Sequence, residues 1–169
     1  MDNRKKVPLK NKLAYGIGTG GGNVFSQIAA AFLLNYYTDT ALIGAGAIAT
    51  MFLVCRVFDG ITDLLMGGIV DKTSTKLGKA RPWLIASAPL SFLGIVLLMN
   101  VPMGLGENGK LVYAYITYIF MSCIVYTIYG ISNTALLPLM THDKDDSTML
   151  ATFSALGNNI IGLIAGSLI

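Results

Sequence analysis

Apolar residues form five long runs along the chain, and short polar connections separate them. A membrane-spanning helix needs roughly 20 apolar residues, because it must cross a hydrocarbon core of about 30 Å. Each run reaches that length. The pattern therefore predicts an all-α fold of polytopic transmembrane helices. The runs cover residues 13–37, 42–70, 83–102, 111–139 and 149–169.

The amino-acid composition supports a membrane protein. Hydrophobic residues occupy 54% of the 169 positions and charged residues only 12%. Soluble domains carry about 25% charged residues, so the chain falls outside that class. We therefore expect membrane lipid to be a partner of most of its surface.

Basic residues cluster in three segments, which alternate along the chain with connections poor in Lys and Arg. Ten of the 12 Lys and Arg residues lie before Leu13, between Asp71 and Pro82, or at Lys144. This is the positive-inside pattern of membrane proteins. It predicts a multi-pass protein of the plasma membrane with a cytoplasmic N-terminus. The net charge of +3 therefore does not indicate a nucleic-acid partner.

Charged residues interrupt the second apolar run at helical spacing. Arg56, Asp59, Asp63, Gly67 and Asp71 are three or four residues apart, so they lie along one stripe of a helix. A charged side chain near the bilayer centre costs at least about 2.5 kcal/mol on insertion scales. These charges must therefore face a cavity, pair with one another, or both, which makes the stripe the first candidate for a functional site.

Two carboxylates of this stripe can converge on one point. Asp59 and Asp63 are four residues apart, and facing carboxylates in a low dielectric repel unless they share a cation or a proton. We expect Na⁺, Li⁺ or H⁺ there, with Thr62 and Thr127 as further oxygen donors for Na⁺. Arg56 leaves the group at net −1, which one monovalent cation neutralises. The alternative is a structural Arg56–Asp59 salt bridge beside a protonated Asp63.

The fourth apolar run carries side chains suited to a polyhydroxylated solute. Tyr126, Tyr129 and Asn133 offer hydroxyl and amide groups deep in the run. Hydrogen bonding between helices, worth about 0.6 kcal/mol per contact, is the alternative to ligand binding. The same two readings apply to Asn158 and Asn159 in the fifth run.

Motifs of enzymes and cofactor sites are absent from the sequence. It contains no HExxH, no P-loop and no paired nucleophile and base, so we expect neither an enzyme nor a bound cofactor. Cys55 and Cys123 lie inside apolar runs without a CxxC partner, as small packing residues do.

Glycines crowd the first apolar run. Gly16, Gly18 and Gly21 formally match GxGxxG, but no strand precedes them, as a dinucleotide site requires. Small residues four apart, such as Gly18 and Gly22, instead let two helices approach closely in lipid. We expect close helix packing or cavity lining here.

A longer motif around the first basic loop resembles a known family. The sequence is similar to the signature of the glycoside-pentoside-hexuronide:cation symporters, a branch of the major facilitator superfamily that includes the melibiose carriers. Tyr36-Tyr37-Thr38-Asp39 and Arg56-Val57-Phe58-Asp59 resemble the same family, so the likeness covers nearly the entire chain. The motif reads Asp63-x3-Gly67-x3-Asp71-x6-Gly78-Lys79-Ala80-Arg81-Pro82-Trp83.

The resemblance implies alternating-access symport of a sugar or glycoside with Na⁺, Li⁺ or H⁺. Asp59 and Asp63 match the family's cation-site carboxylates, and Thr127 matches a hydroxyl ligand of the fourth helix. Thr62 stands where the melibiose carriers have asparagine. Tyr126 matches a tyrosine of the sugar site.

The resemblance also implies a cytoplasmic gate. In the family, this motif holds the inward-facing gate through charge contacts between helices. The matching residues of this chain are Gly67, Asp71, Gly78, Lys79 and Arg81.

Three further positions differ from the melibiose carriers. Asn23 and Gly130 stand where those carriers have sugar-binding aspartates, and Thr134 stands where they have tryptophan. Asn23 is therefore a candidate substrate-binding residue, and a glucuronide, a pentoside or another glycoside remains open as the substrate.

Length sets the expected domain organisation. Facilitator folds pack two six-helix halves around a site at the membrane midplane. We predict a cytoplasmic basic tail at 1–12 and, at 13–169, a five-helix part of the N-terminal transporter domain, whose partner would be the missing C-terminal half. The alternative is a non-transporting membrane module that binds or regulates a partner helix bundle.

Overall fold

The computed structural model describes residues 7–28, 32–141 and 143–167, and over these ranges it contains helices and connections but no strand. The all-α prediction is therefore confirmed. The chain forms two compact units, residues 1–31 with 133–169, and residues 32–132. Residues 1–6 of the predicted basic tail and the last two residues of the fifth run lie outside the described ranges.

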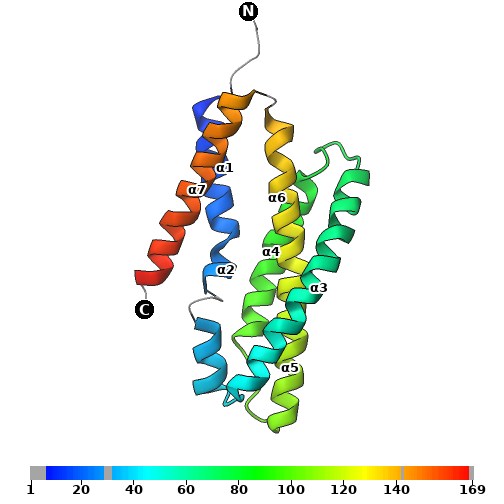
Figure 1. Ribbon diagram of the computed structural model, residues 1–169, viewed down its shortest axis with the longest axis vertical. Helices are drawn as coiled ribbons and strands as arrows, with labels where there is room; N and C mark the ends of the chain where they lie inside the picture. The colour runs from blue at the N-terminus through cyan, green and yellow to red at the C-terminus, as the bar shows by residue number, and fades with distance from the viewer. Residues whose placement is uncertain (1–6, 29–31, 142, 168–169) are drawn as a thin grey trace, which may run out of the picture. The chain divides into compact units, whose positions relative to one another are not determined.

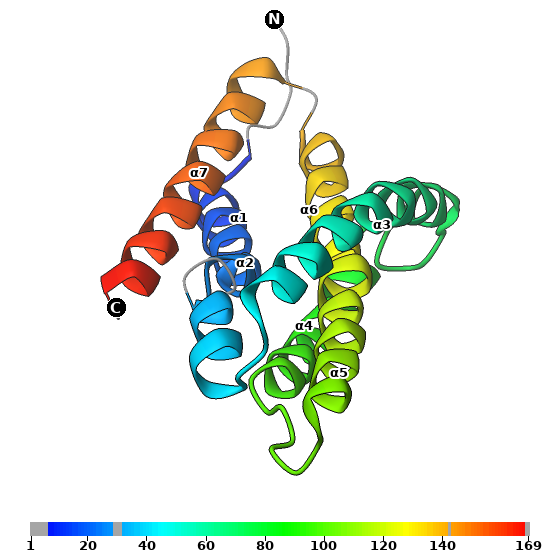
Figure 2. The same ribbon diagram turned by 60° about the horizontal axis from the view of Figure 1, so that its bottom comes forward.

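The first unit is built on the pair of α1 (Leu9–Gly22) and α7 (Lys144–Ser167), with α2 (Val24–Ile28) continuing after α1. α1 and α7 lie side by side (Figures 1 and 2). Their backbones come close because Gly16 and Gly20 of α1 present no side chain to α7. The four-residue spacing of small residues is as predicted, but Gly18 has nothing within 4 Å of an added Cβ. Gly18, which the sequence suggested as a contact residue, therefore does not take part in this close approach.

The first apolar run is not one uninterrupted helix. α1 begins at Leu9, inside the predicted tail, and ends at Gly22, and Asn23 forms a turn before α2. Glycines in a helix interior cost roughly 0.5–1 kcal/mol each, and three in succession precede the break. The Asn23 amide stabilises the turn by donating to Thr19 O at 3.1 Å and Asn158 Oδ1 at 2.8 Å.

The second unit packs three long helices around one another. A π-helical section, η3, contacts α3, α4 and α5. Gly94 of α4 leaves space that the Met121 side chain of η3 fills. The elements are η2 (Tyr36–Thr40), α3 (Ala45–Lys72), α4 (Arg81–Leu98), α5 (Glu107–Ile119), η3 (Phe120–Tyr126) and the first part of α6 (Thr127–Met140).

Three described helical segments are long and apolar enough to cross a membrane: Arg81–Leu98, Glu107–Met140 and Lys144–Ile164. The fourth predicted run is thus continuous, since α5, η3 and α6 follow one another without a break. α3 is longer than a crossing requires, at 28 residues, but charged side chains interrupt it. The chain is an integral membrane protein.

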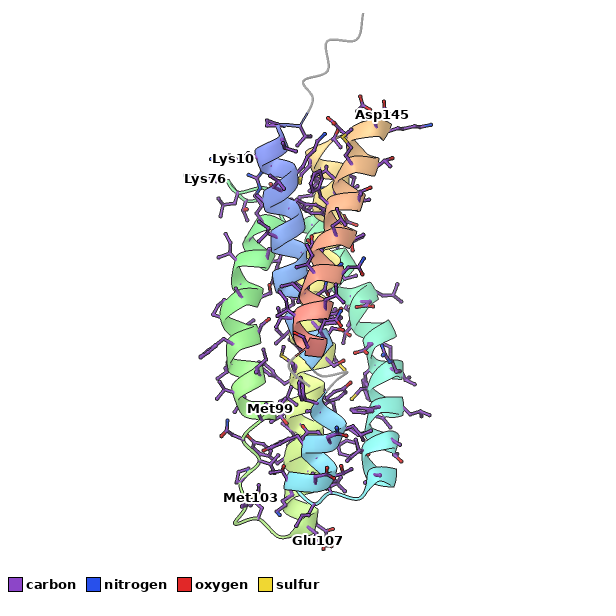
Figure 3. The ribbon with its side chains drawn as sticks, turned by 90° about the vertical axis from the view of Figure 1, so that its left-hand side faces the viewer. Lys10, Lys76, Met99, Met103, Glu107 and Asp145 are labelled. Carbon is purple, nitrogen blue, oxygen red and sulfur yellow. The ribbon has the colours of Figure 1, made fainter. Side chains whose placement is uncertain are left out.

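The connections of each unit lie at its ends. In the second unit, Lys76 lies at the end opposite Met103 and Glu107 (Figure 3). In the first unit, Lys10 and Asp145 lie at the same end, where α1 and α7 both begin (Figure 3). In the second unit, the basic connection and the connection before α5 therefore lie at opposite ends.

Candidate functional site

The charged stripe lies on α3, in the second unit. Asp59 is half-buried, whereas Arg56, Asp63 and Asp71 are exposed. Among the residues that the structure describes, Arg56 forms no ion pair with Asp59 or Asp63. Within the stripe, the carboxylate of Asp59 is therefore the charged group that contacts other helices of this unit.

Asp59 is hydrogen-bonded by a residue that the sequence reasoning missed. The Ser122 hydroxyl of η3 lies 3.0 Å from Asp59 Oδ1 and 3.3 Å from Oδ2, and it donates to the carboxylate. A single serine in an apolar run is a weak signal, because its partner lies 63 positions earlier in the sequence. The contact becomes visible only when the two helices are placed side by side.

A second pair of oxygens lies beside the first. Thr62 Oγ1 of α3 lies 3.4 Å from Thr127 Oγ1 of α6. Thr62 also donates to its own helix, at Phe58 O and Asp59 O, each at 3.1 Å. Asp59 and Thr62 are one helical turn apart, so the structure brings three of the predicted cation ligands into one region. Asp63 lies on the same helix with an exposed side chain and no hydrogen bond to any described residue.

The π-helical section explains how two residues five apart can both face α3. In an α-helix, residues five apart are rotated by about 140°, since one turn takes 3.6 residues. In a π-helix the backbone bonds run from residue i to i+5, so such residues lie nearly above one another. Ser122 is inside η3 and Thr127 follows its end. The altered register therefore directs both hydroxyls toward the same partner helix.

Two buried cysteines lie next to these oxygens. Cys55 and Cys123 are both free thiols, and Cys123 Sγ lies 3.8 Å from the Cys55 carbonyl oxygen. They fill the contact between α3 and η3 as small packing residues. No cluster of three His, Cys, Asp or Glu residues that could hold a metal ion occurs in the described part of the chain.

The predicted sugar-binding residues divide between the units. Tyr126 and Tyr129 belong to the second unit, with ring centroids 6.3 Å apart and Tyr129 buried. Asn23 and Asn133 belong to the first unit. There Asn133 Oδ1 lies 3.4 Å from Thr19 Oγ1, and Asn23 donates to Asn158. The amides thus take part in hydrogen bonding between helices, the alternative considered for these polar residues.

The residues predicted to form the gate lie at the end of α3, in the connection to α4 and at the start of α4. Gly78 has φ +93°, a left-handed conformation that glycine adopts readily. The turn closes through Thr75, whose hydroxyl donates to Gly78 O at 2.8 Å. Asp71, Lys79 and Arg81 are exposed. Their charged groups can therefore contact groups outside this connection.

The first unit contains a buried ion pair that the sequence did not predict. Lys12 Nζ lies 2.6 Å from Asp146 Oδ1, and only 8% and 5% of the two side chains are exposed. Asp146 Oδ2 also accepts the Val7 backbone N–H at 2.7 Å. Lys12 is one of the basic residues assigned to the tail, and its burial against the start of α7 could not be read from charge counting. The pair joins the first turns of α1 and α7.

Comparisons with known proteins bear on the family of the chain. A family model described as MFS/sugar transport protein matches residues 14–169. The inner membrane symporter YicJ of Escherichia coli is 36% identical over 147 residues, which cover 87% of this chain and 32% of the relative. The isoprimeverose transporter of Lactiplantibacillus pentosus is 31% identical over 167 residues, covering 96% of this chain and 34% of the relative. The uncharacterized symporter YnaJ of Bacillus subtilis is 33% identical over 163 residues, with coverage of 96% and 35%. The chain therefore spans about a third of the length of these curated relatives.

Proposed function

This chain belongs to the MFS/sugar transport protein family, and we propose that it supplies the cation-binding part of a carrier that moves a sugar or glycoside together with a monovalent cation. Several relatives are named as symporters, one of them a putative glycoside/cation symporter of Escherichia coli, and another relative is named as an isoprimeverose transporter. These names give less support to the alternative of a non-transporting regulatory module.

The observation that carries the proposal is the group of oxygens between α3 and the helix formed by η3 and α6. Asp59 provides a carboxylate, and Thr62 and Thr127 provide neighbouring hydroxyls 3.4 Å apart. Carboxylate and hydroxyl oxygens are the ligands that hard cations prefer. Asp63, exposed on the same helix, would contribute the second carboxylate when the site is complete.

The coupling follows from electrostatics. With both aspartates ionised and Arg56 charged, the group carries net −1, and one Na⁺, Li⁺ or H⁺ would neutralise it. Neutralisation changes the potential felt by a solute bound nearby, and a ligand that prefers one conformation shifts the population toward it. In the carrier that we propose, Tyr126 and Tyr129 of the second unit supply the sugar side, and the residues from Gly67 to Arg81 supply the gate.

The complete carrier needs more helices than this chain contains. Because the chain spans about a third of its relatives, we assign it the N-terminal portion of an alternating-access carrier in the plasma membrane. The cytoplasmic side would hold the N-terminus and the α3–α4 connection, since both are basic. The remaining helices would close the sugar site.

The test is uptake by the complete polypeptide, meaning the proposed carrier with this chain as its N-terminal portion. It is reconstituted in proteoliposomes and assayed with a panel of radiolabelled glycosides and imposed Na⁺, Li⁺ or pH gradients. We expect gradient-dependent accumulation of at least one glycoside, abolished by Asp59→Asn and by Asp63→Asn. Asp39→Asn serves as the matched control, because Asp39 is an exposed carboxylate in η2. Accumulation that keeps its full cation dependence in both site variants would refute the assignment.

A further inference from the structure

We propose that Ser122 is a positioning residue for an alkali-metal cation, Na⁺ or Li⁺, and that its hydroxyl orients the Asp59 carboxylate that binds this ion. The inference rests on the proposed function and deepens it. Ser122 Oγ lies within 3.3 Å of both carboxylate oxygens of Asp59, so one hydroxyl restrains the rotation of the whole group. A carboxylate held in this way is prepared for its ligand before the ligand arrives.

The bond of Ser122 differs from those of other helical hydroxyls in this unit. Thr117 donates to Tyr113 O at 2.9 Å, and Ser87 donates to Leu84 O at 2.8 Å, each within its own helix. Such local bonds are the usual arrangement for Ser and Thr within helices. Ser122 instead reaches a charged group on another helix. A hydrogen bond to an ionised carboxylate is stronger than one to a backbone carbonyl of the same helix. The Ser122 hydroxyl therefore stabilises the Asp59 carboxylate of α3 and not its own helix.

The surroundings fix Ser122 in place. Its neighbours Met121 and Cys123 are buried, with Met121 packed against Gly94 of α4 and Cys123 against Cys55 of α3. The π-helical register of η3 directs the serine toward Asp59. Packing on both sides and the backbone register therefore determine where the hydroxyl points.

The chemistry of a hydroxyl suits this task. A serine oxygen has one proton and two lone pairs, so it can donate to Asp59 and still offer electron pairs to a cation. Thr62 and Thr127 add two further hydroxyl oxygens on the same pair of helices. Alanine at 122 would leave the carboxylate free to rotate and would remove one oxygen from the region.

The experiment measures cation binding without transport. The complete polypeptide, purified in detergent, is heated in increasing NaCl or LiCl, with choline chloride keeping the ionic strength constant. Binding to the folded state raises the unfolding temperature in a concentration-dependent way. A hydrogen bond to a charged group changes affinity by roughly tenfold or more, so Ser122→Ala should raise the half-maximal cation concentration about tenfold.

Two further variants separate positioning from a general structural role. Ser122→Thr keeps the hydroxyl and should stay within about threefold of the unmodified protein, since the donor is retained. Ser87→Ala removes a buried serine hydroxyl that serves its own helix, and it should leave the half-maximal concentration unchanged. In uptake assays, Ser122→Ala should raise the half-saturating cation concentration, with the maximal rate largely kept.

The outcomes distinguish this inference from the proposed function. Equal cation dependence in Ser122→Ala and the unmodified protein would overturn the positioning role, and so would equal shifts in Ser122→Ala and Ser87→Ala. A protein that ignores Na⁺ and Li⁺ but accumulates a glycoside on a pH gradient would overturn it too, while the proposed function stands. Absence of any gradient-driven uptake would refute both. Should Ser122→Ala not fold, loss of cation affinity in Ser122→Thr would contradict the proposal by itself.

Discussion

The close approach of α1 and α7 makes a position-specific prediction about glycine. A Cβ added at Gly16 would lie 2.6 Å from the Phe153 carbonyl oxygen, and one at Gly20 would lie 2.6 Å from the Gly157 carbonyl oxygen. Both distances are about 0.8 Å short of the 3.4 Å at which ordinary contact begins. Backbone oxygens cannot rotate away as side chains do. The two helices would therefore have to separate.

The expected cost follows from two opposing terms. Extra methyl groups in a packed contact destabilise by about 1–3 kcal/mol, and alanine in place of glycine returns roughly 0.5–1 kcal/mol of helix stability. Gly16→Ala and Gly20→Ala should each lower the free energy of unfolding by about 1–2 kcal/mol. This predicts a fall of a few degrees in the unfolding temperature.

Two glycines of the same helix provide matched controls. Nothing lies within 4 Å of a Cβ added at Gly18 or Gly21. Gly18→Ala and Gly21→Ala should therefore keep or raise the unfolding temperature, since only the helix-propensity term applies. The measurement is thermal unfolding of the complete polypeptide in detergent, followed by circular dichroism. Four variants with the same midpoint would refute the close-packing explanation.

Two further predictions concern the buried ion pair and the gate connection. Lys12→Met removes the ammonium group that lies 2.6 Å from Asp146 and should cost about 3–5 kcal/mol, because it breaks a buried ion pair. Adding Asp146→Asn should recover part of the loss, and a double-mutant cycle with no coupling energy would contradict the pairing. Gly78→Ala forces a side chain into the left-handed conformation and should lower the free energy of unfolding by about 1–2 kcal/mol. Gly104 has open space around an added Cβ and no positive φ, so Gly104→Ala should cost less in thermal unfolding. A larger cost for Gly104→Ala than for Gly78→Ala would be inconsistent with the backbone geometry.

Hydrophobic patterning predicts the helices of this chain well, because burial in lipid depends on long apolar segments that local sequence records. The fourth run predicts the continuous helix Glu107–Met140, and the second predicts α3 with its charged stripe. The pattern does not predict the turn at Asn23, which depends on a hydrogen bond to Asn158 in a helix 135 positions away. Contacts between distant segments decide that break.

The candidate site is predicted only in part for a related reason. Spacing along α3 identifies Asp59 and Asp63, but it suggests that the two carboxylates mainly interact with each other. In the structure, Asp59 is bonded to Ser122, whose orientation depends on π-helical backbone geometry. A shift of one residue in the hydrogen-bond register leaves no mark in composition or apolar spacing. Residues on the second helix of a site therefore need the structure.

The bond between Trp83 and Thr73 gives this protein an optical probe of its own. The indole N–H donates to Thr73 Oγ1 at 3.0 Å, across the connection from α3 to α4. Trp83 is the only tryptophan among these 169 residues. Indole emission responds to the polarity around the ring, so movement of this connection would change the fluorescence without any attached dye. Movement of the α3–α4 connection can thus be followed in time through the emission of Trp83 alone.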